Sequence, residues 1–158
     1  MTRTVRIIDP AAWVDAAPFA AHLERLCAGT GLPWQVVAAY AGVSQRAAAR
    51  LVGVRPRPRL RRIPRTVAQQ LWSVTPEELQ RLRTTWVAAS PTCARVADLV
   101  GLGVPLAELA DRLACTQALV AALADGTPAT VPAVTALRAL VAVEAANRDR
   151  TLDALGAA

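Results

Sequence analysis

The chain has 158 residues, just over half of them apolar and very few aromatic, and a formal net charge of +6. This length allows one domain or two small ones with a real hydrophobic core, and the abundance of alanine favours closely packed helices. No apolar run is long enough to span a membrane, and the first ten residues lack the apolar segment of a secretory signal. We therefore expect a soluble, cytoplasmic protein.

Helix and loop signals divide the chain into four segments. These are an arm at 1–14, a basic unit at 15–75, a bridging helix at 76–90 and a second unit at 91–158. The first unit opens with a helix predicted from Asp15 to Ala28, because apolar residues recur there at helical spacing and two glycines follow.

A glycine turn between two short helices forms the centre of the first unit. Pro33 suits the first turn of a helix at about 33–41, and Ser44 is a good N-cap for a helix at 45–52. Two short helices that cross at a tight turn need small side chains at the crossing, and the many alanines of this stretch supply them. The pattern therefore predicts a helix-turn-helix arrangement.

The segment PWQVVAAYAGVSQRAAARLV, residues 33–52, resembles the helix-turn-helix of lambda-repressor-like bacterial regulators. Gly42, Val43 and Ser44 match the usual G-V-S turn of that family, and Leu51 matches its apolar anchor late in the recognition helix. The resemblance implies an all-α fold and sequence-specific binding to double-stranded DNA, with the helix at 45–52 in the major groove.

The candidate DNA contacts fall into two groups. Outward-pointing residues of the second short helix are the candidates for reading bases: Gln45, Arg46 and Arg50. Glutamine can pair bidentately with adenine and arginine with guanine, and each good pair contributes about 1–3 kcal/mol of discrimination. Residues at the two helix starts and in the loop that follows are the candidates for phosphate contact: Gln35, Ser44, Arg55, Arg57, Arg59, Arg61, Arg62 and Arg65. Alternating prolines favour an extended loop.

The positive charge is concentrated in the first half of the chain. Nine arginines and one acid lie between Phe19 and Thr75, a net of about +8, whereas three arginines and four acids lie between Ala94 and Val143. Contact with a polyanion is therefore assigned to the first unit.

The bridging helix is predicted from a capping box. Thr75 can cap the helix, Pro76 suits its first position, and Glu78 can reach back to the cap. We expect this helix, PEELQRLRTTWVAA, to join the two units.

The second half repeats the first at an offset of 72 residues. Glycine, proline, cap and glutamine positions agree in one register, with Gly31, Pro33, Ser44 and Gln45 matched by Gly103, Pro105, Thr116 and Gln117. We interpret this agreement as a tandem duplication. Ala118 and Ala122 replace the two arginines of the second short helix, so the second unit is expected to serve dimerisation or partner docking.

Few residues are suited to catalysis or metal binding. Cys27, Cys93 and Cys115 lack metal-ligand spacing and are expected as buried, reduced thiols. Any imidazole metal site or histidine-based triad would have to include His22, the single histidine. No nucleophile and base stand at a recognisable spacing, and there is no glycine-rich phosphate loop. We predict no enzyme activity, no cofactor and no metal.

The first interpretation is a sequence-specific transcriptional regulator that binds double-stranded DNA in the nucleoid and forms a homodimer through its second unit. In a variant of it, both units lie on DNA and one chain acts as a pseudo-dimer. An alternative is a nucleoid-associated, architectural protein with little base preference. A further alternative is an adaptor whose helices bind an acidic protein.

Overall fold

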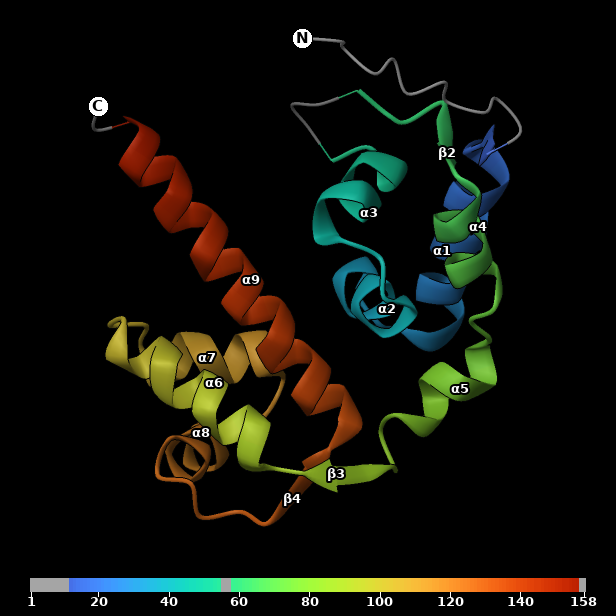
Figure 1. Cartoon of the computed structure of the whole chain (residues 1–158). Coiled ribbons are helices and arrows are strands. Elements are labelled where there is room, and N and C mark those ends of the chain that lie inside the picture. Colours follow the sequence, from blue (N-terminus) through green and yellow to red (C-terminus); the bar gives the residue numbers. More distant parts are fainter. Residues whose placement is uncertain (1–11, 55–57, 157–158) are drawn as a thin grey trace, which may run out of the picture. The chain divides into compact units, whose positions relative to one another are not determined.

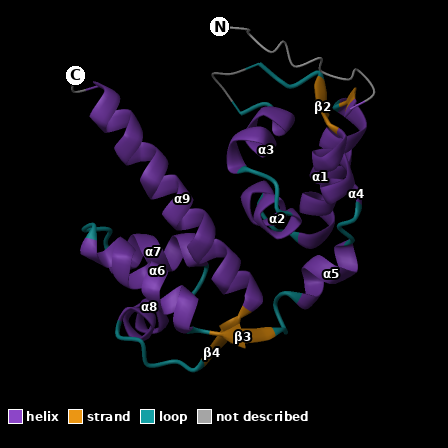
Figure 2. Ribbon diagram, in the orientation of Figure 1, coloured by secondary structure: helices purple, strands orange, loops and turns teal. Residues whose placement is uncertain are grey.

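The computed structural model describes residues 12–54 and 58–156, without the side chains of 153–156 (Figure 1). Within these ranges the chain is mainly helical and contains two short antiparallel ribbons (Figure 2). It divides into two compact units, Met1–Thr75 and Pro76–Ala158. The mainly helical part of the fold-class prediction is confirmed, whereas the ribbons were not expected.

The first unit surrounds one apolar core. In chain order its elements are β1 (Trp13–Asp15), α1 (Ala17–Thr30), α2 (Trp34–Ala41), α3 (Gln45–Val52), β2 (Arg62–Pro64) and α4 (Arg65–Trp72). β1 and β2 pair antiparallel, with Val14 opposite Ile63. Ile63 packs in the core with Leu51 of α3 and Leu71 of α4, so the ribbon is fixed to the helices by burial of apolar surface.

Local sequence signals set the bounds of α3. The hydroxyl of Ser44 accepts a hydrogen bond from the backbone N–H of Ala47 at 3.2 Å, which caps the helix at its start. Gly53 follows the last residue of the helix in the left-handed conformation, with φ of 78°. The helix predicted at 45–52 is therefore confirmed.

The second unit has a core of its own. Its elements are α5 (Pro76–Arg81), β3 (Trp86–Ala88), α6 (Ser90–Gly101), α7 (Leu106–Leu113), α8 (Gln117–Ala124), β4 (Thr130–Pro132) and α9 (Ala133–Gly156). β3 and β4 pair antiparallel, with Val87 opposite Val131. Leu99, Leu109 and Leu123 are fully buried in this core. The described residues of the apolar cluster that contains them all belong to the second unit.

After α5, the second unit repeats the order of elements of the first: strand, three helices, strand, helix. The ribbons also share their register, because Trp13 lies opposite Pro64 and Trp86 lies opposite Pro132. α3 and α8 each begin at a hydroxyl cap, since Thr116 accepts a hydrogen bond from the N–H of Leu119 at 3.2 Å.

The prediction of one bridging helix across 76–90 is wrong. α5 ends at Arg81, a turn follows, and residues 86–88 form β3. Pairing with β4 continues beyond the strand, because the N–H of Ala133 donates to the carbonyl oxygen of Thr85 at 2.8 Å. A long-range ribbon thus satisfies the backbone groups that a continuous helix would have paired internally.

The arm expected at 1–14 needs a correction at its end. Trp13 and Val14 belong to β1, where their backbone pairs with β2. Residues 1–11 of the expected arm lie outside the described residues.

Ala114 is the only described residue other than glycine with a positive φ, at 51°. It follows α7 at the place that Gly42, with φ of 72°, takes after α2. A Cβ in this left-handed conformation costs roughly 1–2 kcal/mol, partly offset by the greater chain entropy of glycine. Ala114→Gly is therefore expected to raise the free energy of unfolding by about 0.5–1 kcal/mol in urea denaturation.

Ala94 provides the matched control, because it is exposed in the interior of α6. Ala94→Gly is expected to lower the free energy of unfolding by about 1 kcal/mol. Destabilisation at both positions would contradict the strain assigned to Ala114.

Candidate nucleic-acid interface

The structure brings two of the three predicted base-reading residues to one hollow of the first unit. Arg46 is exposed and Arg50 is half-buried, and both line a hollow of about 230 Å³ together with Arg62 of β2. The remaining lining residues come from the cap of α3, from α3 itself and from the ribbon: Trp13, Ser44, Ala47, Leu60 and Pro64. Three arginine side chains are therefore among the described residues that line this hollow.

Backbone contacts hold the ribbon side of the hollow beside α3. The N–H of Leu60 donates to the carbonyl oxygen of Arg50 at 3.2 Å. The guanidinium of Arg62 donates through Nη2 to the carbonyl oxygen of Trp13 at 2.6 Å. Arg62 is thus fixed on the ribbon by its neighbouring strand.

Arg50 shows an unusual feature on the α3 side. Its Nε–H is buried and has no acceptor in the part of the chain that the structure describes. Buried guanidinium donors are nearly always hydrogen-bonded, so this N–H is an exception among the donors of the described residues.

The expectation that Gln45 points outward is wrong. Its side chain is only 6% exposed, and its Nε2 donates to the carbonyl oxygen of Gln35 at 2.8 Å. Gln45 begins α3 and Gln35 lies in the first turn of α2, so this hydrogen bond ties the two helices together. The amphipathic pattern could not show this, because the side chain faces a neighbouring helix near the turn.

Gln45→Ala is expected to lower the free energy of unfolding by about 1–2 kcal/mol, because it removes a buried hydrogen bond and leaves a void. Gln117, the first residue of α8, is exposed and offers a matched control. Gln117→Ala is expected to cost less than about 0.5 kcal/mol. Chemical denaturation of both variants measures the difference, and equal small losses would contradict a structural role for Gln45.

The two predicted phosphate contacts at helix starts are arranged differently from each other. Gln35 is half-buried and its carbonyl oxygen accepts the bond from Gln45. Ser44 is exposed, lines the hollow, and uses its hydroxyl as the cap of α3. Only Ser44 therefore lies at the three-arginine hollow.

The described part of the arginine loop contacts other residues of the first unit. Arg59 donates to the carbonyl oxygen of Val52 at 3.2 Å and lies 3.5 Å from the carboxylate of Glu24. Arg61 is exposed directly before β2. Arg65 is exposed at the start of α4 and lines a different, largely apolar hollow. Arg55 and Arg57 lie outside the described residues.

Trp13 is one of the lining residues that sequence reasoning missed. A signal for it exists, because Trp13-Val14 recurs as Trp86-Val87 and each pair begins a strand. The partner strands recur too, as Ile63-Pro64 and Val131-Pro132.

No protein-family model, no curated protein and no solved structure matches the chain. Function therefore rests on geometry and charge.

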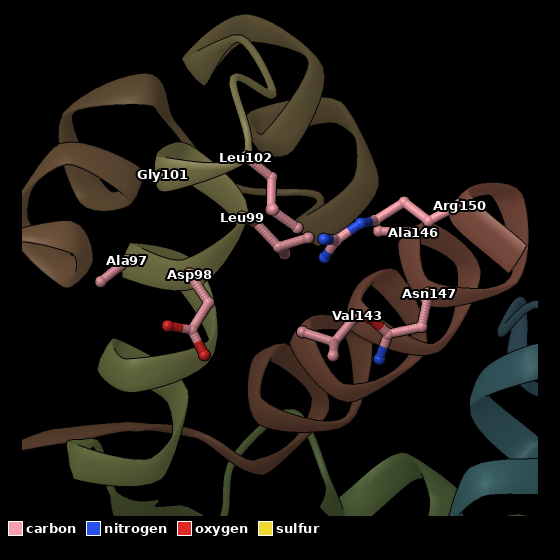
Figure 3. Close-up of a pocket in the computed structure, with 9 residues that line it drawn as sticks. All are labelled: Ala97, Asp98, Leu99, Gly101, Leu102, Val143, Ala146, Asn147 and Arg150. Atoms are coloured by element: carbon pink, nitrogen blue, oxygen red, sulfur yellow. The ribbon is translucent and has the colours of Figure 1, made fainter. Parts of the chain in front are cut away.

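The second unit has a hollow of different character between α6 and α9, of about 400 Å³ (Figure 3). Asp98 from α6 and Asn147 and Arg150 from α9 line it beside apolar residues such as Val143. One acid and one base contribute opposite charges, so this hollow lacks the single-sign field that attracts a polyanion.

The thiols give no sign of a reactive centre. Cys27, Cys93 and Cys115 are free, as expected, although only Cys93 is fully buried. Burial raises the pKa of the Cys27 thiol, and the carboxylate of Glu24 adds to this effect. Burial also raises the pKa of the Cys115 thiol, against the opposing effect of Arg138. Both are therefore protonated near neutral pH, which disfavours nucleophilic chemistry.

The described residues contain no group of three or more His, Cys, Asp or Glu side chains that could hold a metal ion. Among the described helices, none is long and apolar enough to cross a membrane.

Proposed function

We propose that the chain is a sequence-specific transcriptional regulator whose first unit binds double-stranded DNA through a helix-turn-helix formed by α2 and α3. The observation that carries this proposal is the meeting of Arg46, Arg50 and Arg62 at one hollow beside α3. The charge balance of the units supports it. Eleven arginines and three acids lie in Met1–Thr75, against seven arginines and nine acids in Pro76–Ala158.

The dimensions of α3 suit the major groove. An α-helix with its side chains is about 10–12 Å in diameter, close to the width of about 12 Å of the major groove in B-DNA, so a helix such as α3 can enter it. Arg46 lies in the first turn and is exposed, which is where recognition helices of this arrangement contact base edges. With Gln45 buried, we assign base reading principally to Arg46.

Selection from a random pool of duplexes at near-physiological salt tests this function. A regulator should enrich one motif, and Arg46→Ala should relax that motif at one base position at a cost of about 1–3 kcal/mol. Binding without an enriched motif would support the architectural alternative. Absence of duplex binding would overturn the proposal and leave the adaptor alternative.

The second unit is proposed to serve self-association. Trp86 of β3 is 64% exposed, and α8 carries Ala118 and Ala122 at the places that Arg46 and Arg50 take in α3. Two copies can meet through uncharged side chains such as these without repulsion between like charges. Sedimentation of the full chain should therefore give the mass of a dimer, and Trp86→Glu should give a monomer. A monomer at tens of micromolar for the unaltered chain would contradict this part.

A further inference from the structure

A largely apolar hollow of the first unit lies between α1 and α4, which pack beside each other (Figure 1). It has about 480 Å³ of space, within the range of about 300–1,000 Å³ that is typical of sites for small molecules. Phe19 of α1 and Val14 of β1 are among its described lining residues. Four more follow one face of α4 at helical spacing: Arg65, Ala68, Gln69 and Trp72. A mainly apolar lining with a few polar groups is the usual composition of a small-molecule site.

Trp72 is held in place although much of it is exposed. It is 60% exposed and lines the hollow. The ring of Phe19 contacts it in an edge-to-face arrangement, with the ring centroids 6.0 Å apart. The ring centroid of His22 lies 5.0 Å from that of Trp72, and the Nε2–H of His22 donates to the carbonyl oxygen of Val74 at 3.3 Å. Two neighbours thus fix the orientation of an indole ring that still offers apolar surface, which lowers the entropic cost of binding a ligand.

Arg65 places a positive charge at the other end of the same face of α4. Seven residues separate it from Trp72, which corresponds to about 10.5 Å along the helix axis. A guanidinium group matches a carboxylate in geometry as well as in charge. Gln69 lies one turn after Arg65 and can donate a further hydrogen bond. This face therefore combines an anion-binding group with an aromatic surface.

We propose that this hollow binds a small aromatic carboxylate, with the ring against Trp72 and the carboxylate at Arg65. Ala68 lies between these two residues on the same face of α4, and its small side chain leaves space for the body of the ligand. A neutral aromatic compound would make no use of the charge of Arg65. A small aliphatic acid would make little use of the indole ring.

This site is separate from the proposed DNA interface. Among the described residues, none lines both this hollow and the hollow beside α3. The assignment moves Arg65 from phosphate contact to ligand binding, and it does not depend on DNA binding.

Titration of the ¹⁵N-labelled full chain with cinnamate, at constant ionic strength, tests the site directly. The indole Nε1–H resonance of Trp72 and the amides of residues 65–72 should shift together and saturate. Cinnamamide has the same ring and no charge, so it should bind about tenfold more weakly. Acetate has the charge and no ring, so it should give no saturating shift.

Two variants separate the contributions of charge and ring. Arg65→Ala should weaken the binding of cinnamate by about tenfold and leave that of cinnamamide unchanged. Trp72→Ala should weaken the binding of both compounds by about tenfold or more, because the aromatic contact is lost. Unaltered amide spectra away from the hollow show that each variant is folded. Should Trp72→Ala fail to fold, the comparison of the two compounds in Arg65→Ala still tests the site.

Arg25 provides the matched control, because it is an exposed arginine of α1 that does not line the hollow. Arg25→Ala removes the same charge and should leave the binding of both compounds unchanged. Equal losses of cinnamate binding in the Arg25 and Arg65 variants would reduce the effect to net charge and overturn the site.

Three further outcomes decide between occupants and functions. Equal affinities of the unaltered chain for cinnamate and cinnamamide would overturn the assignment of a carboxylate at Arg65. A shift of the Trp72 resonance on dilution without any ligand would show that a second copy covers the hollow, and would overturn the small-molecule site. Binding of cinnamate without binding of any duplex would leave this site standing while the proposed function fails.

Discussion

Replacing Arg50 and Arg62 together by alanine is expected to lower the affinity for duplex DNA by about 100-fold at physiological salt, because two guanidinium groups are lost from the hollow beside α3 in the proposed DNA-binding unit. The slope of log affinity against log salt should fall in magnitude by about 2, since each neutralised phosphate contributes about 0.9. The loss should be similar for every duplex, because phosphates carry no base information. Fluorescence anisotropy over a salt series measures affinity and slope in one experiment.

Two single variants sharpen this expectation. Arg25→Ala lowers the net charge without touching the hollow and should change the slope only slightly. Arg46→Ala should instead change the preferred motif. A double Arg50 and Arg62 variant with an unchanged salt slope would remove both residues from the DNA contact.

Leu51→Ala is expected to lower the free energy of unfolding of the first unit by about 2–5 kcal/mol. Leu51 is 1% exposed and packs in the core of the first unit, so the truncation leaves a cavity that neighbouring helices can fill only in part. Because the second unit has a separate core, its buried amides should keep their protection. Hydrogen exchange detected by NMR distinguishes the two units residue by residue.

Leu123→Ala provides the mirror experiment. Leu123 is fully buried in the core of the second unit, near the end of α8, as Leu51 is near the end of α3. This variant should lose protection in the second unit and keep it in the first, and it should retain the duplex binding that is proposed for the first unit. Loss of protection throughout the chain in either variant would contradict separate cores.

Elements determined by neighbouring residues could be predicted from the sequence. The bounds of α3 follow from the cap at Ser44 and the glycine at 53, which act within a few residues. The agreement of Ser44 with Thr116 likewise identified two capped helices, and both hydroxyls accept the expected hydrogen bond.

Features that depend on distant partners could not be predicted in this way. Each ribbon has strands of three residues, which are too short to show an alternating pattern. The pairing of Trp13 with Pro64 also joins residues that are far apart in the sequence of the first unit. β3 shows the same limit. Helical signals at Pro76 led to a prediction of one long helix, whereas Trp86–Ala88 pairs with β4.

The candidate site illustrates both cases. Arg46 and Arg50 were identified because α3 is amphipathic, and Arg62 because it belongs to an arginine-rich loop. That all three line one hollow depends on the ribbon, which the sequence did not reveal. The burial of Gln45 depends on the approach of α2 to α3, so it required the packed structure.

Because the two units share the same order of elements, the arginines of the first unit can be introduced at matching positions of the second. Ala118 and Ala122 occupy the positions in α8 that Arg46 and Arg50 occupy in α3, and Thr130 occupies the position in β4 that Arg62 occupies in β2. Arginine at these three positions would give one chain two equivalent arginine-lined sites. The unaltered chain has arginines at these positions in the first unit and not in the second. Its second unit can therefore serve as an internal negative control in binding measurements.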